Sequence, residues 1–128
     1  DKVVTMNKIV VTLTLLLSSS VMASEQSCMI EIMHSEAQGE PLTGIIAVGE
    51  ASLNRSKNQN KSICKISGVT RKQVPSKLKG HYIALANEVM VTKDKTIKDA
   101  DSWDRAKKPR YKGKIVARIG KHTFYRMG

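Results

Sequence analysis

An apolar segment near the N-terminus limits how much of this chain is available to build a folded domain. A short positive region ending at Lys8 precedes a largely apolar run over 9–17, and three serines then lead to the small residues that end at Ala23. This order is typical of a secretory signal peptide. The apolar run is shorter than the roughly 20 residues that span a bilayer, which favours cleavage over an uncleaved anchor. We therefore expect cleavage after Ala23, with residues 1–5 lying upstream of the start of the signal.

The predicted mature part, residues 24–128, is long enough for one domain only. A chain of 128 residues excludes a TIM barrel and a dinucleotide fold with a separate substrate domain. The whole chain has 22 Lys and Arg against 11 Asp and Glu, a net charge of +11. The mature part keeps 20 basic and 10 acidic residues, a net charge of +10. The basic character thus belongs to the folded domain and predicts an anionic partner.

The chain has two cysteines, Cys28 and Cys64, and both lie in the mature part. In an exported protein such a pair most simply forms one disulfide, which would contribute on the order of 3–4 kcal/mol to stability. A metal site is disfavoured because the sequence lacks further His or Cys ligands at a useful spacing. We expect a Cys28–Cys64 disulfide, with no metal and no other cofactor.

Apolar residues recur at helical spacing in three segments, which predicts helices over residues 28–38, 42–55 and 76–91. Gly39 is expected to end the first helix. Gly49, on the buried side of the second, predicts close contact with a neighbouring helix. A polar loop is expected between the second and third helices, and a β-hairpin is expected over 115–125. The sequence therefore predicts a mainly helical α+β domain with a small β-hairpin or sheet near the C-terminus.

Glu36 breaks the amphipathic pattern of the first predicted helix. It falls between Ile32 and Met29, inside the apolar arc, whereas His34 falls on the polar side. Burial disfavours an ionised carboxylate, so we expect desolvation to raise the pKa of Glu36, as a general acid needs. The alternative is a structural carboxylate that is neutralised by a buried base such as Arg55.

Three sequence patches carry a resemblance to a known family: HSEAQGEP at 34–41, GIIAVGEASLNR at 44–55 and IGKHTFY at 119–125. In this order they resemble the SleB-type cell wall hydrolase family, whose pattern is E-A-R-G-E, then G-x-x-A-V and L-N-R, and a closing I-G-x-H-x-F-Y. Gln38 departs from the family's usual Arg. The segment 67–106 is short and lysine-rich and lacks the family's aromatic-rich stretch.

The resemblance implies a lysozyme-like fold that cleaves the glycan strand of peptidoglycan between N-acetylmuramic acid and N-acetylglucosamine, as a lytic transglycosylase. Glu36 would be its single acid/base, because the acetamido group of the substrate can stabilise the cationic centre. No metal or cofactor is implied. Glu40, Trp103, His122 and Tyr125 are the substrate-binding residues that we predict, and Glu40 also fits a supporting role beside the second helix.

Two other functions stay open at this point. One is a hydrolytic muramidase or glucosaminidase, and the other is a non-catalytic basic module that binds the cell envelope or nucleic acid. The chain offers few aromatic side chains for stacking on bases near its basic cluster at 105–114, and export argues against a nucleic-acid partner. We expect a monomer, periplasmic or extracellular after cleavage near Ala23, that acts on peptidoglycan at the anionic envelope.

Overall fold

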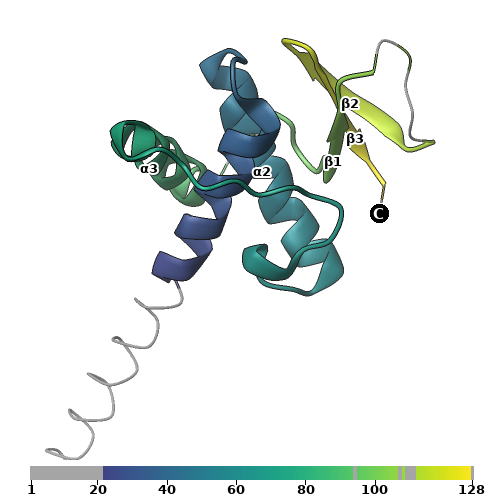
Figure 1. Ribbon diagram of the computed structural model, residues 1–128. Helices are drawn as coiled ribbons and strands as arrows, with labels where there is room; N and C mark the ends of the chain where they lie inside the picture. The colour runs from purple at the N-terminus through teal and green to yellow at the C-terminus, as the bar shows by residue number, and fades with distance from the viewer. Residues whose placement is uncertain (1–21, 94, 107, 109–111, 128) are drawn as a thin grey trace, which may run out of the picture.

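The computed structural model describes residues 22–93, 95–106, 108 and 112–127, so most of the predicted signal peptide lies outside the described residues. Within these ranges, three helices precede a small three-stranded antiparallel sheet (Figure 1). The helices are residues 22–37, α2 (Leu42–Gln59) and α3 (Ser76–Val91), and the strands are β1 (Ser102–Asp104), β2 (Lys114–Ile119) and β3 (His122–Arg126). The predicted α+β class is confirmed.

The first helix ends where the sequence predicts, at a left-handed glycine. Gly39 has a φ of 84°, and the Glu40 N–H closes the turn onto the Ala37 carbonyl at 3.1 Å. In the described part of the chain, no helix combines the length and the apolar composition that a membrane span requires. α2 extends four residues beyond its predicted end at Arg55, because the left-handed residue that closes it is Asn60.

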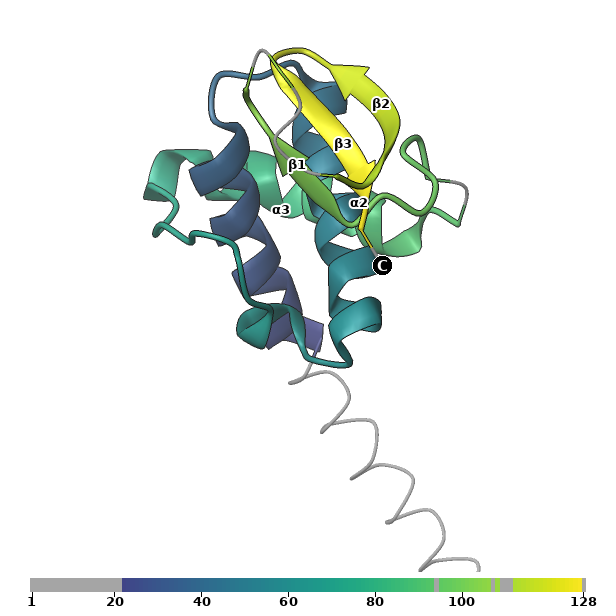
Figure 2. The ribbon, with the colours of Figure 1, turned by 90° about the vertical axis from the view of Figure 1, so that its right-hand side faces the viewer.

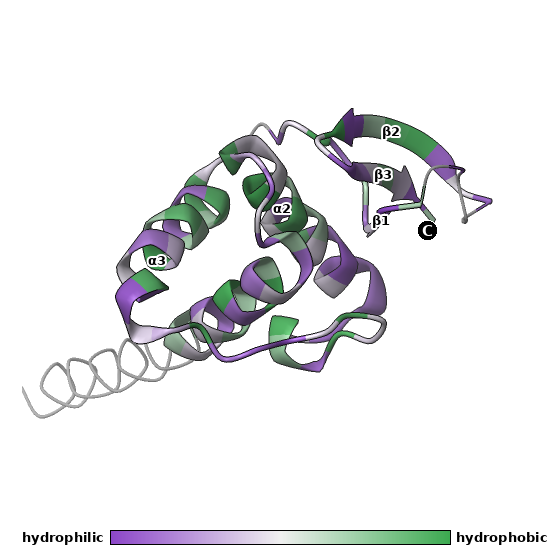
Figure 3. Ribbon diagram, turned by 45° about the horizontal axis from the view of Figure 1, so that its top comes forward, coloured by the Kyte–Doolittle hydropathy of each residue, from purple (hydrophilic) through white to green (hydrophobic). Residues whose placement is uncertain are grey.

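The three helices pack around one apolar core, and their hydrophobic residues alternate with polar ones along each helix (Figure 3). Gly49 of α2 lies where a β-carbon would be 3.0 Å from Val89 of α3 and 3.2 Å from Met33 of the first helix. This close approach confirms the contact predicted for Gly49. The polar position predicted for His34 is wrong: its ring is buried and meets the ring of Tyr82 edge-on at 5.3 Å, because α3 packs on that side.

The sheet has the strand order β1-β3-β2, so the C-terminal strand is central and almost wholly buried. β2 and β3 form the predicted hairpin, with Gly120 at its turn in a left-handed conformation. The sequence did not indicate β1, which adds Trp103 opposite Phe124.

A disulfide joins Cys28 of the first helix to Cys64 in the short 3-10 helix η1 (Ile63–Lys65), as predicted. The loop after η1 then runs along the first helix (Figure 2), and its Lys72 N–H donates to the Glu31 carbonyl at 3.4 Å. The disulfide thus holds a segment without regular secondary structure against the helix that carries Glu36.

Replacing both Cys28 and Cys64 by Ser should lower the free energy of unfolding by about 3–4 kcal/mol, because the disulfide closes a loop between residues 36 apart. Denaturant unfolding with and without a reductant measures this loss. The double variant should be insensitive to reductant, and equal stability of both proteins would contradict the stabilising role.

Candidate active site

Glu36 lies in the last turn of the first helix, half-buried in a pocket of about 310 Å³. Four segments of the chain meet there: the first helix, the loop before α3, the end of β1 and the start of β3. The lining residues are Ser35, Glu36, Gly68, Trp103, Asp104, Arg105 and His122. The pocket therefore exists only in the folded chain, because its walls lie far apart in sequence.

Both oxygens of the Glu36 carboxylate accept hydrogen bonds. Oε1 accepts from the Thr70 backbone N–H at 2.9 Å and from the Thr70 hydroxyl at 2.7 Å. Oε2 accepts from the indole N–H of Trp103 at 3.0 Å. Since the Thr70 hydroxyl proton points to Glu36, the Ser35 hydroxyl, 2.7 Å away, acts as donor to Thr70. The carboxylate is thus held from two sides.

These donors decide the protonation of Glu36 in the free protein. Burial acts to raise the pKa of Glu36, but the hydrogen bonds from Thr70 and Trp103, together with the electrostatic effect of His122, outweigh it, and the pKa lies below its ordinary value. The raised pKa that we expected from the helical pattern is therefore wrong. The desolvation is present, but helical periodicity carries no information about donors from distant segments.

Trp103 is 6% exposed and lies between Glu36 and Arg55. Its ring packs under the Arg55 guanidinium at 4.6 Å, while its N–H reaches the carboxylate. Arg55 donates to the carbonyls of Ser67, Gly68 and Asp101. These contacts make Arg55 a structural residue that holds loop carbonyls around the Trp103 ring. Stacking of Trp103 on a sugar stays a prediction.

The buried His122 ring lies between the Glu40 carboxylate and the Arg105 guanidinium. Its Nδ1 lies 3.0 Å from Glu40 Oε1, although the two atoms do not align as a hydrogen bond. Its Nε2 accepts from the Arg105 side chain at 3.3 Å, which requires an unprotonated nitrogen. Burial lowers the pKa of His122, and Arg105 adds to that effect against the opposing charge of Glu40. We therefore assign a neutral imidazole at neutral pH.

Glu40 supports the site from behind the pocket. Its carboxylate accepts from the Lys121 backbone N–H at 3.0 Å in the β2–β3 turn. Gly120 fits there because it has a φ of 59° and because a β-carbon would lie 2.6 Å from Glu40 Oε2. The Glu40 side chain, 5% exposed, thereby fixes the turn that leads into His122.

Of the five site residues that the sequence predicts, Glu36, Trp103 and His122 line the pocket and Glu40 and Tyr125 do not. Tyr125 is fully buried, and its hydroxyl donates to Asp104 Oδ1 at 3.3 Å. It therefore presents no surface to a ligand in this structure. Sugar contacts by Glu40 and Tyr125 stay predictions that nothing in the geometry supports.

Sequence reasoning missed Thr70 as a partner of Glu36. Thr70 lies in a loop without periodicity, 34 residues away, so no local signal marks it. In the sequence, Arg105 stands out only as the first residue of the basic cluster at 105–114. Its Nη2 donates to the carbonyls of Glu36 and Gln38, each at 3.4 Å, and it thereby ties the end of the first helix to the segment that follows β1.

Two solved structures share this fold. The crystal structure of the catalytic domain of the Bacillus cereus SleB protein matches with a TM-score of 0.61 and 18% identity, over 80% of this chain and 89% of that one. The catalytic domain of the germination-specific lytic transglycosylase SleB from Bacillus anthracis matches with a TM-score of 0.58 and 18% identity, over 80% and 93%. No protein-family model and no curated protein sequence matches the chain.

The chain therefore has the α+β fold of SleB catalytic domains. The resemblance seen in the sequence patches is confirmed for the fold. At 18% identity the structural similarity shows the fold alone. Within the described ranges, no three His, Cys, Asp or Glu side chains gather as a metal site would require.

Thr70→Val should raise the pKa of Glu36, because it removes the hydroxyl donor and keeps the backbone one. An NMR titration of the Glu36 carboxyl carbon measures the shift. A depressed folded pKa stabilises the fold above the unfolded pKa, and that contribution is lost as pH falls through the folded value. The variant should thus be less stable at neutral pH and converge with the parent protein in acid.

Thr70→Ser is the matched control, because it keeps the hydroxyl and should leave the pKa of Glu36 close to that of the parent protein. Equal pKa values for the Val and Ser variants would contradict a role for the hydroxyl.

Gly120→Ala should destabilise the protein by about 1–2 kcal/mol or more, because the left-handed backbone disfavours a β-carbon and Glu40 occupies its place. Gly80→Ala in α3, where nothing lies within 4 Å of the new β-carbon, should instead stabilise by roughly 0.5–1 kcal/mol. Denaturant unfolding of both variants checks the opposite signs. A neutral Gly120→Ala would contradict the packing of Glu40 under the turn.

Proposed function

We propose that this protein is an exported lytic transglycosylase that cleaves peptidoglycan glycan strands between N-acetylmuramic acid and N-acetylglucosamine. The observation that carries the proposal is a half-buried carboxylate, Glu36, held in a pocket by donors from Thr70 and Trp103. The fold shared with SleB catalytic domains, one of them described as a lytic transglycosylase, supports the same reaction class.

In the first step, Glu36 acts as the general acid. The free protein holds Glu36 ionised, but burial already opposes that charge. A glycan strand that fills the pocket excludes water and strengthens this opposition, so the carboxylate takes up a proton in the complex. It then donates the proton to the glycosidic oxygen as the bond from the muramic C1 to that oxygen breaks. The acetamido group of the muramic sugar stabilises the positive charge that develops at C1.

In the second step, the same group acts as the base. The Glu36 carboxylate accepts the proton of the muramic C6 hydroxyl while the C6 oxygen bonds to C1. The products are a 1,6-anhydromuramic end and a free 4-hydroxyl on the glucosamine unit, so no water is consumed. One carboxyl therefore serves both steps, in contrast to glycosidases that use a pair.

The remaining features fit an enzyme of the cell envelope. In this proposal residues 1–23 comprise the upstream residues and the signal peptide that directs export, and residues 24–128 form the catalytic domain, which works as a monomer. A disulfide is typical of a protein in an oxidising compartment. The predicted net charge of the mature part holds it near an anionic polymer. Hydrolysis by water in place of the C6 hydroxyl is the alternative, and the end group of the product separates the two.

Glu36→Gln should lower the rate of glycan release from purified sacculi by about 100-fold or more, because the amide cannot transfer a proton. Binding to sacculi should persist, since Gln keeps the shape of the side chain. Release of soluble glycan and co-sedimentation measure the two effects.

Glu31→Gln provides the matched control, since Glu31 lies on the same helix outside the Glu36 pocket and should keep full activity. Release at the parent rate by Glu36→Gln would contradict the mechanism. Binding without release by the parent protein would favour a non-catalytic envelope-binding module.

A further inference from the structure

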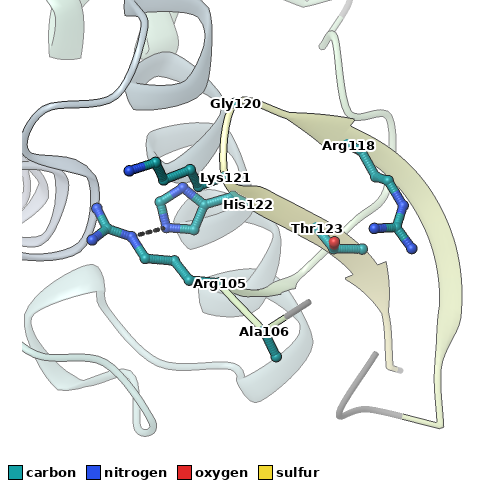
Figure 4. Close-up of a pocket in the computed structure, with 7 residues that line it drawn as sticks. All are labelled: Arg105, Ala106, Arg118, Gly120, Lys121, His122 and Thr123. Carbon is teal, nitrogen blue, oxygen red and sulfur yellow. Dashed lines mark hydrogen bonds between the residues drawn. The ribbon is translucent and has the colours of Figure 1, made fainter. Parts of the chain in front are cut away.

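A second pocket, of about 450 Å³, adjoins the pocket that contains Glu36. Arg105 and His122 line both, so the two hollows share a wall. Figure 4 shows Arg118 on β2, Lys121 in the β2–β3 turn and Arg105 hydrogen-bonded to His122. The lining residues are Arg105, Ala106, Arg118, Gly120, Lys121, His122 and Thr123, which include three cations and no carboxylate.

No carboxylate side chain compensates these cations within the described part of the chain. The Arg105 guanidinium is held by three neutral acceptors, which are the His122 ring and the carbonyls of Glu36 and Gln38. The ion pairs found among the described residues involve neither Arg118 nor Lys121. Glu40 lies beneath the turn, where it meets the backbone of Lys121. Figure 4 shows Arg105 and Lys121 on one side of His122 and Arg118 on the other, and a hollow lined by cations attracts an anion.

The position of Arg105 relates this site to the substrate. Because Arg105 lines both pockets, a group attached next to a scissile bond at Glu36 would lie close to the second pocket. Peptidoglycan peptides branch from the muramic sugar, next to that bond, and they carry carboxylates. Arginine recognises a carboxylate with paired hydrogen bonds, and a partly fixed guanidinium loses less entropy in doing so.

We propose that the pocket formed by Arg105, Arg118 and Lys121 binds a carboxylate of the peptide attached to the muramic acid unit. This rests on the proposed function. The pocket selects charged, peptide-bearing strands and sets their register relative to Glu36.

The test compares two double variants that lose the same charge. Arg118→Gln/Lys121→Gln alters the pocket, and Lys77→Gln/Lys79→Gln alters lysines of α3, on the far side of the molecule from the sheet (Figure 1). Both are made in the Glu36→Gln background, so that binding to intact sacculi is measured without cleavage. Co-sedimentation is repeated with sacculi whose carboxylates have been amidated, and with sacculi stripped of wall-polymer phosphates.

Arg118→Gln/Lys121→Gln, the pocket variant, should bind intact sacculi about fivefold more weakly, the effect expected of two exposed charge pairs. Lys77→Gln/Lys79→Gln, the α3 variant, should lose much less affinity. Amidation of the sacculi should weaken the binding of the Glu36→Gln protein and of the α3 variant. It should change the binding of the pocket variant least. Phosphate stripping should leave this pattern unchanged. Equal losses in both double variants, equal sensitivity to amidation, or a loss that follows phosphate stripping would each overturn the proposal.

A cleavage assay with Glu36 intact separates this proposal from the proposed function. Arg118→Gln/Lys121→Gln should raise KM about fivefold with kcat within about twofold of the parent protein, because the pocket contributes to binding and not to proton transfer. If no protein cleaves sacculi but the binding pattern holds, the proposed function fails and the anion pocket stands. If Arg118→Gln/Lys121→Gln cleaves sacculi with the same KM as the parent protein, the pocket proposal alone fails.

Discussion

The Glu36 carboxylate, shared between Thr70 and Trp103, is the interaction on which this site depends. It joins the first helix to a loop 34 residues away and to a strand 67 residues away. A carboxylate half-buried without such donors would be costly, so the loop and the strand stabilise the ionised Glu36 in the pocket. The Cys28–Cys64 disulfide and the Arg55 contacts to Ser67 and Gly68 carbonyls hold the loop there.

The same contacts set a balance that suits acid/base chemistry. Burial favours the protonated form of Glu36, while the hydrogen bonds favour the carboxylate. In the free protein the hydrogen bonds prevail. In the proposed reaction, a substrate that removes water from the pocket would strengthen the effect of burial, so that binding itself would change the protonation state of Glu36. In that reaction one group must first give a proton and then take one, so both the burial that favours the acid and the hydrogen bonds that favour the carboxylate have a use.

Features that depend on local pattern could be predicted from the sequence. Apolar spacing gives the bounds of α3, Gly39 marks a helix end and Gly49 marks a helix contact. Two cysteines in a domain with a predicted export signal predict the disulfide. Glu36 stands out because it breaks its helix's apolar arc.

Contacts between distant segments could not be predicted. Thr70 lies in an aperiodic loop, and its hydrogen bonds reverse the direction expected for the pKa of Glu36. β1 arises in a charge-rich segment, because its pairing with β3 outweighs its composition. His34 and Tyr125 are buried by elements that their own neighbours in sequence do not specify. The sequence patches nevertheless identify the fold, since they combine helix ends, packing positions and the β2–β3 turn.

The most direct test of the central claim is mass spectrometry of the fragments that the purified protein releases from sacculi. The mechanism with Glu36 as the single acid and base predicts fragments with 1,6-anhydromuramic ends, which lack one water relative to hydrolysis products. Fragments with reducing ends would show that water is the nucleophile, and the absence of soluble fragments would show that the pocket does not cleave glycan. Either result would contradict a transglycosylase mechanism at Glu36.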